Sequence, residues 1–182
     1  MHRNAIYGLL VFVLFCWGCT SHEPPLSEGA HRLKHDFKDV LSLLTPALVE
    51  PASRDDAPAV STAVDHLFSD AEKRGKPIEL VVVVLDKNGV SLAMRLPEAN
   101  KTVNSRRENY RNYTAVIETL KEQRASSARL YLQNGSHLCV ICSPLLKDGR
   151  VVGVLVVGLT TEDISKSYGI MEKEFLRIDF NR

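Results

Sequence analysis

The sequence has little excess charge of either sign and few cysteines. Among 182 residues, 23 are Lys or Arg and 22 are Asp or Glu, so the formal net charge is only +1. This balance leaves no excess of basic residues to bind the phosphates of nucleic acid, so we expect no nucleic-acid partner. Four cysteines are too few for a small domain held together by disulfides. With 45% hydrophobic and 25% charged residues, the composition is that of a globular chain with one domain.

Motifs typical of enzymes and of metal sites are also missing. The sequence contains no glycine-rich phosphate loop, no H-E-x-x-H and no G-x-S-x-G. His31 and His35 could share a helix face, but no cysteine lies near them, which favours a solvated pair over a zinc site. His137 has no second histidine near it in the sequence. We therefore expect a protein that is not an enzyme and that holds no metal or cofactor.

The N-terminus is predicted to be a signal peptide that spans residues 1–18. A short positive start precedes an uninterrupted apolar run from Ala5 to Trp17. As a helix this run would measure about 20 Å, which is less than the hydrocarbon core of about 30 Å. Apolar runs of this length are typical of signal peptides. No later run is long and apolar enough to span a bilayer.

Gly18-Cys19 resembles the bacterial lipobox, which implies cleavage after Gly18 and a diacylglycerol or palmitate anchor on Cys19. The match departs from the pattern at Cys16 and Trp17, where Leu and a small residue are preferred. The alternatives are an ordinary secretory signal and an uncleaved anchor. Thr20 stands where lipoproteins of the inner membrane commonly have Asp, which favours the outer membrane. We expect a cell-envelope lipoprotein that faces the periplasm.

After a lipidated tether at residues 19–26, residues 27–76 are predicted to form helices. Ser27 can cap a helix with one apolar stripe, in which Pro46 should cause a kink or a new start. Residues 51–58 contain two prolines and predict a loop. Asp56 can cap a second helix.

The remaining residues, 77–182, predict a sheet with flanking helices. Three two-residue turns, each ending in glycine, join apolar runs and therefore predict antiparallel hairpins. A single five-stranded antiparallel sheet of order 2-1-5-4-3 follows, which makes this an α+β fold. The expected strands are 78–85, 90–96, 128–133, 136–146 and 151–159.

Two further helices are predicted in this part. Ser105 and Glu108 match a capping box, so a helix should start there and carry Tyr110 and Tyr113 on one face. A last helix should run from Thr161 through Phe175, with Met171 on its apolar side.

This order of elements resembles the Cache superfamily, the extracytoplasmic PAS-like sensor domains of bacterial receptors. The resemblance covers residues 80–160. It rests on five short segments: the strand and turn Val81–Gly89, then Asn109–Tyr113, Ala128–Tyr131, Ser143–Leu145 and Val151–Leu155. The resemblance implies a PAS-like fold, a ligand pocket between the sheet and the helix that joins strands 2 and 3, and a partner that transmits the signal.

The candidate ligand-binding residues are arginines and tyrosines around that expected pocket. Guanidinium groups near a helix start suit a carboxylate or another anion. Arg129 and Tyr131 share one face of strand 3 and would meet Tyr110 and Tyr113 if that face looks at the helix. The alternative is a solvated basic turn beside core tyrosines. The full set is Arg106, Arg107, Tyr110, Tyr113, Arg129 and Tyr131.

Cys139 and Cys142 have the C-x-x-C spacing but fall in a predicted strand. Along a strand their Cα atoms lie about 10 Å apart and their side chains point to opposite faces. A disulfide needs Cα atoms within about 7 Å, so we expect two buried, unpaired thiols.

The sequence thus predicts a lipid-anchored module that binds a small molecule, such as an organic anion, and acts through a membrane receptor or kinase. The alternative is a structural lipoprotein whose PAS-like domain serves only as an interaction surface.

Overall fold

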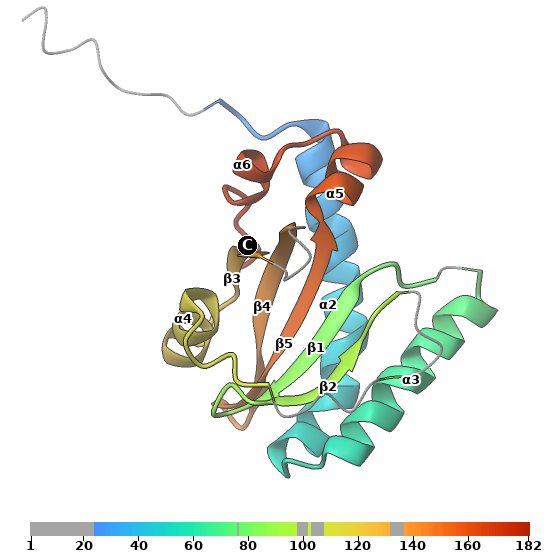
Figure 1. Cartoon of the computed structure of the whole chain (residues 1–182), viewed down its shortest axis with the longest axis vertical. Coiled ribbons are helices and arrows are strands. Elements are labelled where there is room, and N and C mark those ends of the chain that lie inside the picture. Colours follow the sequence, from blue (N-terminus) through green and yellow to red (C-terminus); the bar gives the residue numbers. More distant parts are fainter. Residues whose placement is uncertain (1–23, 76, 98–101, 103–107, 132–136) are drawn as a thin grey trace, which may run out of the picture.

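The structure is a computed structural model and describes residues 24–75, 77–97, 102, 108–131 and 137–182. A five-stranded antiparallel sheet forms its centre, with the long helix α2 behind it in the view of Figure 1 and α4 beside its opposite face. The elements in chain order are α2 (Glu28–Ser53), α3 (Ala57–Lys73), β1 (Val81–Asp86), β2 (Ser91–Arg95), α4 (Thr114–Glu122), β3 (Ser126–Tyr131), β4 (His137–Lys147), β5 (Arg150–Thr160), α5 (Thr161–Tyr168) and α6 (Glu172–Phe175).

The sheet confirms the predicted strand order, β2-β1-β5-β4-β3, with antiparallel pairing throughout. The β4–β5 turn consists of Asp148 and Gly149, which both have positive φ, as a tight hairpin requires. At the β1–β2 turn, Gly89 has positive φ and the Asp86 carboxylate accepts the backbone N–H of Asn88 and of Val90. The predicted Asn134-Gly135 turn lies outside the described residues.

The two faces of the sheet pack against different helices and form two separate clusters. On the α2 face, side chains of α2, α3 and the C-terminal segment pack against the sheet in the larger cluster, which includes Phe37, Val64 and Phe175. On the α4 face, Ala115 and Val116 of α4 pack against the sheet in a smaller cluster. Gly153 of β5 has no room for a side chain beside β1, whereas contact with α2 would be ordinary. A Cβ at this position would lie 2.5 Å from the Leu85 carbonyl oxygen and 3.5 Å from Ala52 Cβ.

Helix α2 is continuous to Ser53, so the helix does not start anew at Pro46 and the predicted loop from residue 51 is wrong. Both Pro46 and Pro51 lie inside the helix. A proline in a helix interior costs about 3 kcal/mol. Leu44 and Leu48 on either side of Pro46 are fully buried, and each contributes about 1.5–3 kcal/mol, which outweighs that cost. The predicted caps are confirmed, because the Ser27 and Asp56 side chains each accept a backbone N–H at a helix start.

The chain after α5 turns back on the domain, so the predicted single last helix is wrong. Gly169 adopts a left-handed conformation that ends α5, and Met171 is 76% exposed instead of being packed. Phe175 and Phe180 then pack against Phe37 of α2.

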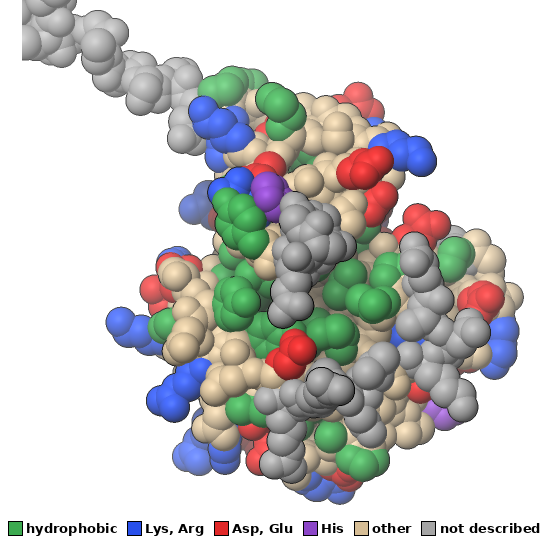
Figure 2. All heavy atoms as spheres, in the orientation of Figure 1, with side chains coloured by type: hydrophobic (Ala, Val, Ile, Leu, Met, Phe, Trp, Pro, Cys, Tyr) green, Lys and Arg blue, Asp and Glu red, His purple; other side chains and the backbone are tan. Residues whose placement is uncertain are grey.

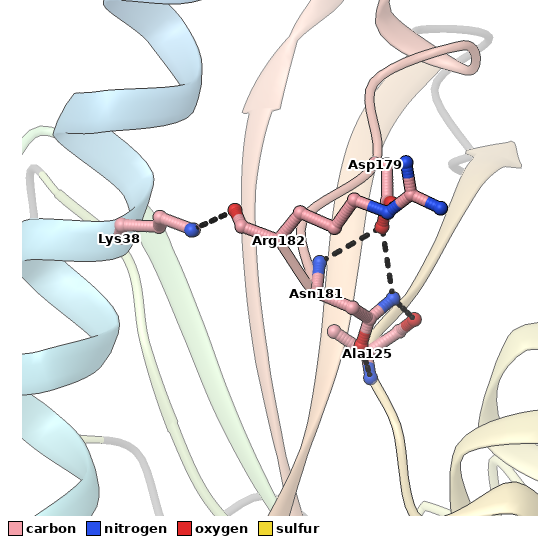
Figure 3. A network of polar contacts seen from close by, with 5 residues as sticks. All are labelled: Lys38, Ala125, Asp179, Asn181 and Arg182. Carbon is pink, nitrogen blue, oxygen red and sulfur yellow. Dashed lines mark hydrogen bonds and ion pairs between the residues drawn. The ribbon is translucent and has the colours of Figure 1, made fainter.

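The last residues join α2 to the start of β3 (Figure 3). Asn181 accepts the backbone N–H of Ala125 and donates to its carbonyl, and Lys38 donates to the carbonyl of Arg182. Among the residues that the structure describes, no helix combines the length and apolar character needed to cross a bilayer.

Candidate functional site

The candidate site is the α4 face of the sheet. Strand register places side chains in rows across it, because directly paired residues of an antiparallel sheet point to the same side. One row contains Met94, Val83, Val156 and Cys142, and the next contains Val81, Gly158, Val140 and Ala128. Apart from Ser126, which pairs with Cys142 at the β3 edge, these rows are apolar, so they form a hydrophobic floor without a charged group.

Figure 2 shows this face with hydrophobic side chains gathered at its centre, in a hollow bordered by polar groups. Little of this floor is exposed. Val83 and Val156 keep 7% of their surface exposed, and Met94 and Val81 are half-buried. At the α4 end the floor is closed, because Thr119 is fully buried and donates to the Cys142 carbonyl oxygen.

Tyr110 and Tyr113 both lie next to this face, but not on a helix as predicted. Helix α4 starts only at Thr114, and Asn109 instead forms an isolated antiparallel bridge with Val90 beside β2. In this pairing the Tyr110 N–H donates to the Gly89 carbonyl and the Ser91 N–H donates to the Glu108 carbonyl, so these groups are satisfied without a helix. Tyr110 packs against the α4-face cluster, and its ring centroid lies 5.6 Å from that of Tyr113.

The Tyr110 hydroxyl donates to the Glu108 carboxylate at 2.7 Å. Burial raises the pKa of Tyr110, and the hydrogen bond to the neighbouring Glu108 raises it further, so the phenol stays protonated. Tyr113 is 43% exposed. Together, the two rings form an aromatic pair at the edge of this face, and the Tyr110 hydroxyl is engaged by Glu108.

Arg129 and Tyr131 lie on the opposite face, so their predicted convergence with Tyr110 and Tyr113 is not found. In β3, Ala128 and Leu130 point to the α4-face cluster, and the alternate residues Arg129 and Tyr131 therefore point to the α2 face. Arg129 forms an ion pair with Glu172 of α6 at 2.6 Å and lies over the Tyr131 ring at 4.7 Å. Its charge is already matched within the chain.

The other predicted residues cannot be placed. Arg106 and Arg107 lie outside the described residues, as do Ser105 of the expected capping box and Cys19. Their roles stay predictions.

Cys139 and Cys142 confirm the prediction from strand geometry. Both lie in β4 as free, buried thiols, Cys139 in the α2-face cluster and Cys142 in the α4-face cluster. Burial raises the pKa of Cys139 to about 11 and that of Cys142 to about 12. Neither thiol forms the reactive thiolate at neutral pH.

Two features of the α2 side were not predicted. Arg95 of β2 is buried and forms an ion pair with Asp65 of α3 at 2.6 Å, and Asp65 also accepts the Thr102 backbone N–H and hydroxyl. The second feature is an open groove of about 980 Å³ between α2, α3 and α5. Its floor includes Phe37 and Ile78, and its walls carry four carboxylates and one arginine: Asp36, Asp39, Glu79, Asp163 and Arg74. Neither feature could be predicted from the sequence, because each brings together side chains that lie far apart along the chain.

Comparison with known proteins yields similarity in fold only. No family model matches the sequence, and no curated protein matches it. Among solved structures, the extracellular domain of a protein described as a histidine kinase, vpHK1S-Z8, superposes with a TM-score of 0.57 at 16% identity, over 76% of this chain and 55% of that one. A domain of a sensory box/GGDEF family protein of Vibrio parahaemolyticus gives 0.56 at 13% identity, over 80% and 60%.

A third match is the sensory domain of the Campylobacter jejuni chemoreceptor Tlp3 with isoleucine bound. It has a TM-score of 0.51 at 14% identity, over 84% of this chain and 72% of that one. The chain spans little more than half of the first two domains.

The fold is therefore the one that these sensory domains share, a five-stranded antiparallel sheet of order 2-1-5-4-3 with flanking helices, as predicted. None of the three matched domains is described as catalytic.

Proposed function

We propose that this chain is the ligand-binding module of an envelope sensor, anchored by a lipid on Cys19 and facing the periplasm. Its support is the apolar α4 face with two tyrosines at its edge, in a fold that it shares with extracellular and chemoreceptor sensory domains. The module binds a small molecule there and acts through a membrane receptor or kinase. The outer membrane is the proposed location.

The proposed ligand has an apolar part and an anionic end. The apolar part packs on the floor around Val83 and Val156, because burying hydrophobic surface is the main source of affinity that this face offers. Tyr110 and Tyr113 contribute the aromatic pair and their hydroxyls. Arg106 and Arg107 are the proposed partners of the anionic end, since a buried charge needs a charged or hydrogen-bonding partner. Arg129 is not part of this proposal, because its charge is matched by Glu172.

The groove of the α2 side favours a second candidate, a structural lipoprotein that binds another protein and no small molecule. An acidic wall around an apolar floor suits a basic partner surface. In this case the α4 face is only a packed core.

A thermal-shift screen against amino acids and small carboxylates separates the two candidates. A ligand present at 100 times its Kd stabilises the folded chain by about 2.7 kcal/mol. For a domain of this size, each kcal/mol of added unfolding free energy raises the Tm by about 2–4 °C. Under the sensor proposal, at least one compound raises the Tm by several degrees.

The same screen on two variants tests the site. Tyr110→Ala should abolish the shift, because it removes half of the aromatic pair. Tyr131→Ala is the matched control: it removes the same side chain from the opposite face, where Tyr131 is 63% exposed, and should leave the shift intact. If no compound shifts the Tm, or if both variants respond like the unchanged chain, the proposal of a ligand site on this face is wrong.

A further inference from the structure

The C-terminal segment contacts the residues that link the N-terminal tether to α2. Before α2 begins, the Ser27 backbone N–H donates to the Glu174 carboxylate at 2.7 Å, and the Arg177 guanidinium donates to the Pro24 carbonyl oxygen. In Figure 1 the chain leaves the domain at this end, beside α5 and α6. The tether therefore starts at a fixed point next to α6.

The two residues that flank α6 are large, apolar and exposed. Met171 precedes the helix with 76% of its surface accessible, and Leu176 follows it with 42%. Lys173 lies between them and is exposed. Pro24 and Pro25, which are also exposed, lie at the end of the tether that adjoins α2. Hydrophobic, basic and acidic side chains lie together at this end of the molecule in Figure 2.

The two carboxylates of α6 are engaged within the fold, whereas Glu28 at the start of α2 and Glu162 of α5 are exposed. Glu172 is paired with Arg129 on β3. Glu174 accepts the N–H of Ser27, and this hydrogen bond lowers its pKa. The exposed surface beside α6 is therefore formed mainly by Met171, Leu176 and Lys173, and its contribution to docking is apolar rather than electrostatic.

Only five chain steps separate Cys19 from Pro24, which at full extension is about 17 Å. If Cys19 carries the lipid, this span limits the distance between Pro24 and the bilayer surface. α6 stays close to the bilayer as well, because Arg177 holds Pro24 beside it. A tether this short raises the effective concentration of the membrane around α6, so that a few exposed apolar side chains suffice for contact. Lysine can keep its ammonium group in the headgroup layer while its stem lies on apolar surface.

We propose that the α6 end, defined by Pro24, Pro25, Met171, Lys173 and Leu176, docks on the lipid bilayer and fixes the orientation of the sheet relative to the membrane. The proposal rests on the proposed lipid anchor at Cys19. Contact is mainly apolar, because one free lysine contributes little attraction to anionic lipids. The α4 face then stands beside the membrane surface and stays open to the periplasm.

The test uses the full acylated chain in vesicles of phosphatidylethanolamine and phosphatidylglycerol, with an environment-sensitive fluorophore on one introduced cysteine. Met171→Cys places the probe at α6. Leu146→Cys is the control, since Leu146 is an exposed apolar residue, 42% accessible like Leu176, but lies next to the β4–β5 turn. The buried Cys139 and Cys142 should not take up label, which the unsubstituted chain verifies.

At position 171 we expect a blue-shifted emission that brominated lipids quench, and at position 146 the emission of a probe in water. Met171→Ser combined with Leu176→Ser should weaken quenching of a probe at position 173 without lowering the Tm, because both side chains are exposed. Replacing the anionic lipid with phosphatidylcholine should change the signal little.

Vesicle flotation separates the two possible failures. If the chain does not float with vesicles, the anchor itself is wrong and the docking proposal is lost with it. If the chain floats but the probe at 171 reports water, or if 146 is quenched equally, the anchor stands and docking through α6 is wrong.

Discussion

The Arg129 guanidinium lies 2.6 Å from the Glu172 carboxylate and joins the edge strand β3 to the segment after α5. The pair is partly exposed, with 37% and 23% of the two side chains accessible. Hydrogen bonding to Glu172 raises the pKa of Arg129, so the guanidinium stays charged. Arg129, a candidate for the anion pocket from the sequence, therefore forms an ion pair within the chain instead.

Replacing Arg129 with Ala should lower the Tm slightly and leave ligand-induced stabilisation unchanged. The ion pair reaches solvent, and pairs of this kind contribute little to stability. Tm with and without the compound found in the thermal-shift screen measures both effects. If folded Arg129→Ala lost the ligand-induced increase in Tm, Arg129 would belong to the binding site after all.

Asp65→Asn should destabilise the chain by about 1–2 kcal/mol at neutral pH. Arg95 is only 11% exposed and would lose its carboxylate partner. The expected cost is below the 3–5 kcal/mol of a fully buried pair, because Asp65 is 35% exposed. Asp70→Asn on the same helix is the control, since Asp70 forms only an exposed pair with Lys73.

The cost of Asp65→Asn should shrink in acid. Burial pushes the pKa of Asp65 upward, but hydrogen bonds from Thr102 and the charge of Arg95 outweigh it, so the folded pKa lies below the ordinary value of 3.8. A lowered folded pKa stabilises the folded state above the unfolded pKa, and this stabilisation is lost as the pH falls through the folded pKa. Urea unfolding at pH 7 and pH 3 measures the difference. A difference that stays constant would show that the Asp65 charge does not stabilise Arg95.

The thiols of Cys139 and Cys142 should be unreactive in the folded protein and separately reactive after unfolding. Their raised pKa values, about 11 and about 12, leave almost no thiolate at pH 8. Mass spectrometry of unreduced protein, alkylated in denaturant, should find both cysteines modified. A linkage between Cys139 and Cys142 would contradict the strand geometry of β4.

Cys19→Ser should leave an unprocessed precursor, or a protein that no longer partitions into detergent, because the acylated thiol is missing. Immunoblots of membrane and soluble fractions measure this. Normal processing and partitioning of Cys19→Ser would mean that the N-terminus is an ordinary secretory signal or an uncleaved anchor.

The sheet could be predicted because its signals are local. Tight turns such as Asp148-Gly149 determine which strands are neighbours, and the most apolar runs, β1 and β5, belong at the centre. Helix caps at Ser27 and Asp56 are local in the same way. In α2, tertiary burial of Leu44 and Leu48 outweighs the local signal of Pro46, which no short window can reveal.

The candidate site depended on long-range packing and was predicted only in part. Alternation along β3 correctly put Arg129 and Tyr131 on one side. However, nothing local indicated that α4 covers the other side and that α6 brings Glu172 to Arg129. Tyr110 and Tyr113 do lie at the α4 face, although through a bridge to Val90 and not through a helix.

Ligand density in a crystal structure of the chain, purified without refolding and with the compound from the screen added, tests the account most directly. We expect a small molecule on the α4 face, with its apolar part over Val83 and Val156 and within contact of Tyr110. Density in the groove between α2 and α3, or an empty α4 face at a saturating concentration of a compound that raises the Tm, would contradict the proposed site.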